Sequence, residues 1–234
     1  MLPVVILAGG HATRLLPITK VLPKALVDVA GIPFIIRQMS YLQEQGIRKV
    51  VLCIGYLGDM IRDVVGSGQK FGINVSYSED GPNLLGTGGA LMKAIPHLGH
   101  EFFVLYGDSF LPVNFSAVQS AYHLSRKPAL MTVLKNQNQW DKSNVVFVDG
   151  QLQEYNKHTQ HSGMSYIDYG LGVFSTSVME QNPFGLSFDL ADLYQHLSVQ
   201  NQLAGMEVYE RFYEIGSHTG LKETEEFFFA KEKV

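Results

Sequence analysis

Three cationic side chains follow a glycine pair near the start of the chain, at a spacing that suits phosphate binding. Residues 4–7, Val-Val-Ile-Leu, form a short β-branched apolar run of the kind found in buried strands. Gly9-Gly10 follows at once, and two glycines let the backbone turn sharply and expose N–H groups. Arg14, Lys20 and Lys24 then supply positive charge. The stretch therefore predicts a triphosphate site.

The glycine turn matches neither of the two common phosphate-binding loops. The stretch lacks G-x-x-x-x-G-K-[ST] and a complete G-x-G-x-x-G, which argues against a P-loop and a dinucleotide fingerprint. Residues 7–26 instead closely resemble the signature of the sugar-1-phosphate nucleotidyltransferases, Leu-Ala-Gly-Gly-x-x-Thr-Arg-Leu-x-Pro-x-Thr-x-x-x-Pro-Lys-x-Leu. Two positions depart from the family pattern, since Ala12 replaces a glycine and Asp28 a proline. A glycine turn that only joins a strand to a helix would not explain the spacing of Arg14 and Lys24.

The resemblance implies a fold and an activity. The family has a Rossmann-like α/β fold, in which helices flank a mixed, mostly parallel sheet. Its members condense a nucleoside triphosphate with a sugar 1-phosphate to give an NDP-sugar and pyrophosphate, for surface polysaccharides or glycoconjugates. Residues 85–90, 166–174 and 213–217 look most like heptose- or mannose-1-phosphate guanylyltransferases. GTP and a heptose or hexose 1-phosphate are therefore the favoured substrates.

Magnesium is the cofactor that the resemblance implies, because both reactants are anions. Asp108 follows Tyr106-Gly107 at the end of a predicted strand, where a metal ligand is expected; capping of a turn is the alternative. The family has a second, late Asp in an aromatic-x-Asp-x-Gly-Thr pattern. Glu214 stands there in this chain and adds one methylene. An exposed glutamate on an edge strand is the alternative for Glu214.

The resemblance also assigns residues to each substrate. Arg14 would hold the β- and γ-phosphates through its planar fork, and Lys24 the α-phosphate or the sugar phosphate. Thr87 has helix capping as an alternative role. The predicted nucleotide-binding residues are Leu7, Ala8, Gly9, Gly10, Thr13, Arg14, Gly86, Thr87 and Gly107. The predicted sugar-phosphate-binding residues are Lys24, Gly88, Glu154, Lys157, Asp168, Tyr169 and Gly170, of which Glu154 and Lys157 alternatively lie on a solvated hairpin.

The elements that would position these residues alternate in the first half of the chain. Apolar runs and periodicity predict β-α-β units, and hence parallel strands with helices on both faces. Ligands bind such sheets at the carboxyl ends of the strands. Strands are expected at 4–7, 49–54, 73–77 and 101–105, and helices at 33–45 and 59–65. A second glycine loop is expected at 84–90, followed by a helix through about residue 95. The second half is expected to hold helices at 114–125, 190–200 and 221–233 and strands at 129–134, 144–148, 151–155, 166–175 (interrupted by Gly170 and Gly172), 205–208 and 211–215.

The bulk properties fit one compact domain of 234 residues. We expect a nucleotide-binding part at about 1–110 and a sugar-phosphate-binding part at about 111–234. The net charge of -4 implies no broad basic face for nucleic acid. Cys53, the only cysteine, lies in an apolar run and is expected to be buried and inert. Without an apolar run of about 18 residues or a visible signal peptide, we expect no membrane contact, a cytoplasmic location and a monomer or homodimer.

Three other functions compete with the guanylyltransferase hypothesis. Uridylyl-, thymidylyl- and cytidylyltransferases share the same core. A non-catalytic nucleotide-sugar-binding regulatory subunit belongs to another class, and the presence of Arg14, Lys24 and Asp108 together argues against it. A dinucleotide-dependent dehydrogenase is disfavoured by the missing third glycine and by Pro23-Lys24.

Overall fold

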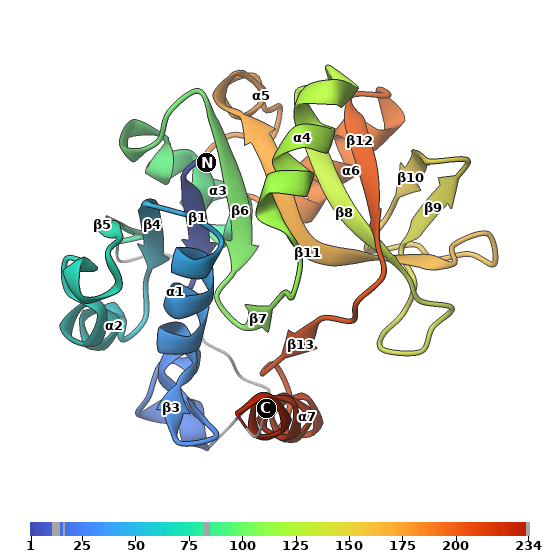
Figure 1. The fold of residues 1–234 in the computed structure, drawn as a ribbon. Coiled ribbons are helices and arrows are strands. Elements are labelled where there is room, and N and C mark those ends of the chain that lie inside the picture. Colours follow the sequence, from blue (N-terminus) through green and yellow to red (C-terminus); the bar gives the residue numbers. More distant parts are fainter. Residues whose placement is uncertain (11–14, 16, 82–84, 233–234) are drawn as a thin grey trace.

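The centre of the molecule is a mixed sheet. The computed structural model describes residues 1–10, 15, 17–81 and 85–232. The strands of the sheet are β1 (Val4–Leu7), β4 (Lys49–Ile54), β5 (Asn74–Glu79), β6 (Glu101–Tyr106), β8 (Ala129–Lys135), β9 (Val145–Val148), β10 (Gln151–Tyr155), β11 (Tyr166–Ser175) and β12 (Leu203–Val208). Within the described residues they run in the order β10-β9-β11-β6-β1-β4-β5, and β8 lies between β11 and β12 (Figure 1).

The first half of the sheet is parallel and buried on both faces. β1 pairs in parallel with β4 and β6, and β4 pairs in parallel with β5. Val4, Val5 and Ile6 are fully buried, which is why this strand is a continuous apolar run and not an alternating one. β11 runs antiparallel to β6 and to β8 and links the two halves of the sheet. These pairings confirm the predicted α/β class, a mixed sheet flanked by helices.

Helices cover both faces and form two cores. Successive side chains of a strand point to opposite faces, so Val4 and Ile6 pack in the core that contains Ile35, while Val5 packs in the core that contains Leu91. In Figure 1 α1 and α4 lie in front of the sheet, and α3 and α6 lie behind it. The helices are α1 (Phe34–Glu44), α2 (Gly58–Val65), α3 (Gly86–Ala94), α4 (Phe115–Ser125), α5 (Thr176–Glu180), α6 (Leu190–Val199) and α7 (His218–Lys231).

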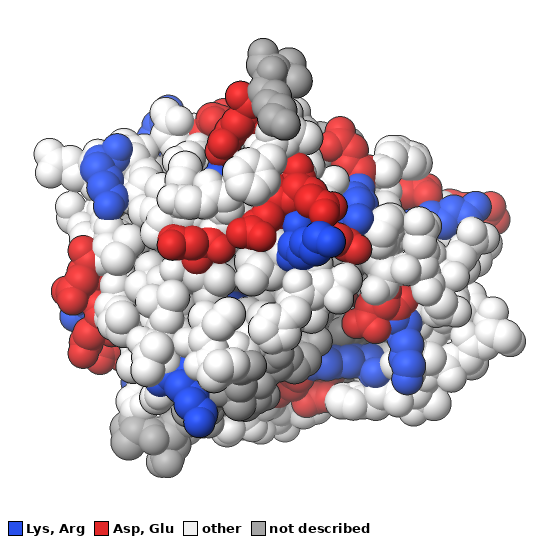
Figure 2. Space-filling model, turned by 90° about the horizontal axis from the view of Figure 1, so that it is seen from below, with Lys and Arg blue, Asp and Glu red and all other residues white. Residues whose placement is uncertain are grey.

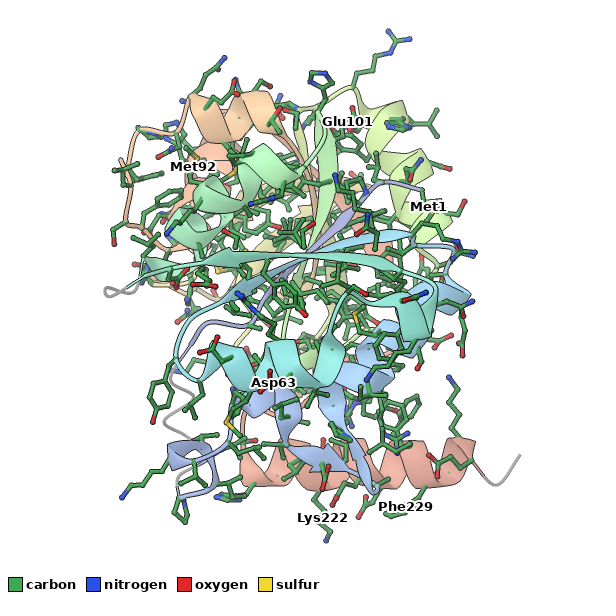
Figure 3. The ribbon with its side chains drawn as sticks, turned by 90° about the vertical axis from the view of Figure 1, so that its left-hand side faces the viewer. Met1, Asp63, Met92, Glu101, Lys222 and Phe229 are labelled. Atoms are coloured by element: carbon green, nitrogen blue, oxygen red, sulfur yellow. The ribbon has the colours of Figure 1, made fainter. Side chains whose placement is uncertain are left out.

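A third, smaller core ties the end of the chain to the carboxyl edge of the sheet. Phe110, Ile215 and Phe228 are buried together in it. α7 forms a layer below the sheet, from which Lys222 and Phe229 point outward (Figure 3). The core fixes two short ribbons, β7 (Ser109–Phe110) with β13 (Tyr213–Glu214) and β2 (Asp28–Val29) with β3 (Ile32–Pro33).

Most predicted elements are present, and the differences have local causes. The strand expected at 211–215 is only Tyr213–Glu214, because its partner β7 has two residues. The last helix begins at His218 and not at 221, since the Ser217 hydroxyl accepts the Gly220 N–H over 3.0 Å and caps it. β11 is one continuous strand with a register shift between Asp168 and Gly172, and not an interrupted one. Cys53 is buried, as expected. No helix in the described part of the chain is long and apolar enough to cross a membrane.

Candidate active site

The carboxyl ends of β1, β4 and β6 bring the glycine turn beside Asp108. The Ala8 N–H donates to the Cys53 carbonyl over 2.9 Å, and the Gly107 N–H donates to the Leu7 carbonyl over 2.9 Å. A Cβ at residue 107 would lie 2.9 Å from the Ala8 Cβ, so only glycine allows this close approach of the two backbones. The segments that follow the strands therefore form one packed edge.

A cavity of about 240 Å³ opens at this edge. It gathers residues from six separate parts of the chain, including the carboxylate of Asp80, which the sequence analysis did not single out. Of the predicted nucleotide-binding residues, Leu7, Ala8, Gly9, Gly10, Gly86, Thr87 and Gly107 line it, together with Lys24 and Asp108. Thr13 and Arg14 lie outside the described residues.

Lys24 and Asp108 form an ion pair inside this cavity. The Lys24 Nζ lies 2.9 Å from the Asp108 Oδ2, and the two side chains are 15% and 27% exposed. Lys24 begins a short 3-10 turn directly after Pro23, and the fixed φ of proline helps to aim it. A cation and a carboxylate are thus held in contact in the wall of the cavity.

A larger cleft of about 980 Å³ adjoins the first cavity. Thr87 and Tyr106 line both, so they form the wall that the two share. Of the predicted sugar-phosphate-binding residues, Lys157, Asp168, Tyr169 and Gly170 line the larger cleft. The arrangement places a small cavity lined by several glycines next to a wide polar cleft, which suits two substrates that react with each other.

Residues 3–180 match the sequence model of the family described as nucleotidyl transferase. The chain belongs to this family. It is 37% identical over 113 residues to N-acetylmuramate alpha-1-phosphate uridylyltransferase of Neisseria meningitidis serogroup B, covering 48% of this chain and 49% of the relative. It is 33% identical over 148 residues to D-glycero-alpha-D-manno-heptose 1-phosphate guanylyltransferase of Campylobacter jejuni, covering 63% of each.

The same fold is found in solved structures. HddC from Yersinia pseudotuberculosis, in complex with GMP-PN, superposes with a TM-score of 0.80 at 25% identity, over 97% of this chain and 100% of that one. The aligned parts span about half to three-fifths of the length of the two curated relatives.

Asp189, which the sequence analysis missed, lines the larger cleft beside the wall that the two cavities share. Its Oδ1 accepts hydrogen bonds from the Thr87 hydroxyl over 2.8 Å and from the Ala191 N–H over 3.1 Å. Its Oδ2 lies 2.6 Å from the Lys157 Nζ. The Thr87 hydroxyl in turn accepts the Leu190 N–H over 2.8 Å, so it caps α6 and not its own helix. Thr87 and Lys157, predicted for different substrates, are thereby linked through one carboxylate.

Two predicted sugar-phosphate residues lie elsewhere in the described structure. Glu154 lines neither cavity and its Oε2 lies 3.1 Å from the His161 Nε2. Gly88 also lines neither, and a Cβ there would collide with the Phe188 ring. Close packing of α3 against residue 188 therefore accounts for this glycine.

Of the two metal ligands predicted from the sequence, Asp108 lies in the turn between β6 and β7, and Glu214 lies on β13. Glu214 pairs with Ser109 across β13 and β7, one residue from Asp108. Its Oε2 accepts the Gly216 N–H over 2.7 Å, and it faces the larger cleft. Among the described residues no group of three His, Cys, Asp or Glu side chains is placed to hold a metal. The carboxylates of Asp108 and Glu214 nevertheless fit Mg²⁺, which binds one or two carboxylates and completes its shell with substrate phosphates and water.

Charges of both signs lie on the face of the molecule that is seen from below (Figure 2). On the face in Figure 2, Lys and Arg side chains are interspersed with Asp and Glu and gather in no broad basic area.

Asp168 carries a perturbed carboxyl group in the larger cleft. Burial raises its pKa to about 6, while the Gly170 N–H, which donates to its Oδ1 over 2.9 Å, and the Lys157 charge oppose the rise. Because the folded state disfavours the ionised form, this group lowers stability as the pH rises from about 4 through 6, and the full penalty remains above that range.

We therefore expect Asp168→Asn to be more stable than the wild type at pH 8 and nearly equal to it at pH 4. The amide oxygen can still accept the Gly170 N–H, and the ionisation penalty of about 1 to 3 kcal/mol is removed. Thermal unfolding midpoints measured from pH 4 to 8 test this. A stability difference that stays constant over the range would contradict the assignment.

Proposed function

We propose that this chain condenses a nucleoside triphosphate with a sugar 1-phosphate to give an NDP-sugar and pyrophosphate, for surface polysaccharide or glycoconjugate synthesis. GTP is the favoured nucleotide, and a heptose or hexose 1-phosphate the favoured acceptor. The observation that carries the proposal is the Lys24–Asp108 pair, held in a glycine-lined cavity that shares a wall with a second, larger cleft.

In this proposal a phosphate oxygen of the sugar 1-phosphate attacks the α-phosphorus, and the bond to the pyrophosphate oxygen breaks. No side chain needs to act as a base, because the attacking phosphate is already ionised near neutral pH. Lys24 holds the α-phosphate or the sugar phosphate as a point charge, and Arg14 holds the leaving pyrophosphate. Asp108 and Glu214 would hold Mg²⁺, which would supply the neutralisation of phosphate charge.

The two cavities are lined by different parts of the chain. The residues that line the smaller cavity fall between 7 and 108, and most of those that line the larger cleft fall between 139 and 223. We therefore assign the nucleotide to the part at about 1–110 and the acceptor to the part at about 111–234. Lys157 and Asp168 would bind the phosphate and the hydroxyl groups of the acceptor.

Asp80 supports guanine as the base. The side chain is buried in the wall of the smaller cavity, and a Cβ on Gly9 would lie 3.1 Å from its Oδ2. Burial raises the Asp80 pKa, and Lys93 and the Leu85 N–H oppose the rise. Guanine presents two adjacent donors, N1–H and N2–H, to such a carboxylate. Uracil and thymine present one N–H between two carbonyl oxygens, which the carboxylate repels. This side chain adds to the backbone discrimination that residues 7–10 and 84–89 would supply.

We expect kcat/KM for GTP to exceed that for UTP, dTTP and CTP by at least about tenfold with one accepted sugar 1-phosphate, since mismatched bases leave buried polar groups unpaired. Pyrophosphate release from the four triphosphates against a panel of sugar 1-phosphates measures this. In Asp80→Asn the margin of GTP should shrink. Preference for UTP, as the Neisseria relative's name suggests, would overturn the guanylyl assignment but not the transferase one. Nucleotide binding without pyrophosphate release would favour a regulatory subunit.

A further inference from the structure

Gln38 has a buried side-chain amide that forms hydrogen bonds with the backbone on either side of Asp108. It lies on α1 and is 2% exposed. Its Nε2 donates one hydrogen bond to the Tyr106 carbonyl over 3.0 Å and a second to the Ser109 carbonyl over 2.8 Å. One side chain thus spans the four-residue turn that carries Asp108, from a helix about 70 residues away in the sequence.

The other backbone bonds of this turn come from the sheet edge and from the end of the chain. The Gly107 N–H donates to the Leu7 carbonyl over 2.9 Å, and the Ile215 N–H donates to the Asp108 carbonyl over 2.9 Å. Gln38 supplies the bonds to the two outer carbonyls, at residues 106 and 109. The position of the Asp108 carboxylate therefore depends on α1 as well as on the strands.

The side-chain oxygen of Gln38 has no hydrogen-bond partner in the described part of the chain, which indicates that glutamine is needed here for its N–H donors. Its Oε1 is buried and has no hydrogen-bond partner among the described residues. A buried acceptor without a partner destabilises the fold, and an apolar side chain of the same length would avoid this cost. A glutamine here is explained if holding the 106–109 turn outweighs the unpaired oxygen.

We propose that Gln38 is a positioning residue for the metal-binding carboxylate of Asp108. Its two hydrogen bonds hold the turn so that the carboxylate meets both Lys24 and a metal-bound triphosphate at a fixed place. Groups that orient a metal ligand typically contribute about 10- to 100-fold to metal affinity. The inference rests on the proposed function, in which Asp108 binds Mg²⁺.

The test compares triphosphate binding with Mg²⁺ and with EDTA, by calorimetry and without acceptor. The probe is the triphosphate with the highest kcat/KM in the four-way comparison. The metal enhancement, which is the ratio of the two dissociation constants, should fall about tenfold in Gln38→Met, while the dissociation constant in EDTA stays within about twofold of the wild type. Gln38→Asn retains the amide but is one methylene shorter and reaches fewer carbonyls, so the loss of metal enhancement should be intermediate. This second variant keeps the test valid if Gln38→Met does not fold.

Tyr41→Phe is the matched control. Tyr41 lies one turn further along α1, and its hydroxyl donates to the Val113 carbonyl over 3.1 Å, outside the turn of Asp108. It should lower Tm much as Gln38→Met does and leave the metal enhancement unchanged. A wild-type enhancement in both Gln38 variants, or an equal loss in Tyr41→Phe, would overturn the positioning role alone. A wild-type enhancement in Asp108→Asn would instead overturn the metal role of Asp108, and the inference with it.

Discussion

An Asp108→Asn variant is expected to lose about 1,000-fold in kcat, equivalent to about 4 kcal/mol of the barrier, and to keep its fold. Asparagine has the same shape as aspartate but no charge. The variant therefore loses the proposed metal carboxylate and leaves Lys24, 15% exposed, without its 2.9 Å partner. The turn itself should persist, because its backbone bonds come from Gln38, Leu7 and Ile215.

Initial rates at saturating and at limiting Mg²⁺ measure the effect, and thermal unfolding checks the fold. Asp63→Asn is the matched control, since this exposed residue on α2 undergoes the same chemical change and lines neither cavity in the described structure. Asp108→Asn activity close to that of the wild type at limiting Mg²⁺ would show that Asp108 does not hold the metal.

A Lys24→Met variant is expected to lose about 100-fold in kcat/KM, equivalent to about 2.7 kcal/mol. Methionine keeps much of the length and apolar stem of lysine but removes the ammonium group that would meet a phosphate. Because Lys24 is also the partner of Asp108, the variant removes the cation that pairs with a partly buried carboxylate and should be less stable than the wild type.

Steady-state kinetics that vary each substrate in turn show which phosphate Lys24 serves. A larger rise in the KM of the sugar 1-phosphate would assign it to the acceptor, and a larger rise in the KM of the triphosphate to the α-phosphate. Lys20→Met is the control, because Lys20 belongs to the same basic stretch, is exposed and does not line the smaller cavity. Wild-type kinetics for Lys24→Met would rule out a role for Lys24 in the reaction.

The sequence by itself determined the elements whose signals are local. The apolar run at 4–7 is long enough for a strand and too short for a helix, and it forms β1. The glycine pair behind it, and the signature through residue 26, indicated the family that the comparison of residues 3–180 then showed. Asp108 was predicted at a strand end because a parallel strand and its loop are adjacent in sequence.

Only the tertiary structure decided which distant side chains meet. Lys24 and Asp108 are 84 residues apart, Thr87 and Asp189 are 102 residues apart, and local periodicity carries no information about either pair. Asp189 directly precedes the helix predicted at 190–200, and nothing in the sequence indicates that its carboxylate contacts three partners.

Gln38 is the clearest example of a contact that local sequence patterns do not predict. In the sequence it is one polar residue in an amphipathic helix, and nothing adjacent to it implies burial or a role. Its two bonds arise because α1 packs on the face of the sheet where β6 ends and the turn of Asp108 begins. Packing between elements decides such contacts, and the sequence encodes that packing only through the whole chain.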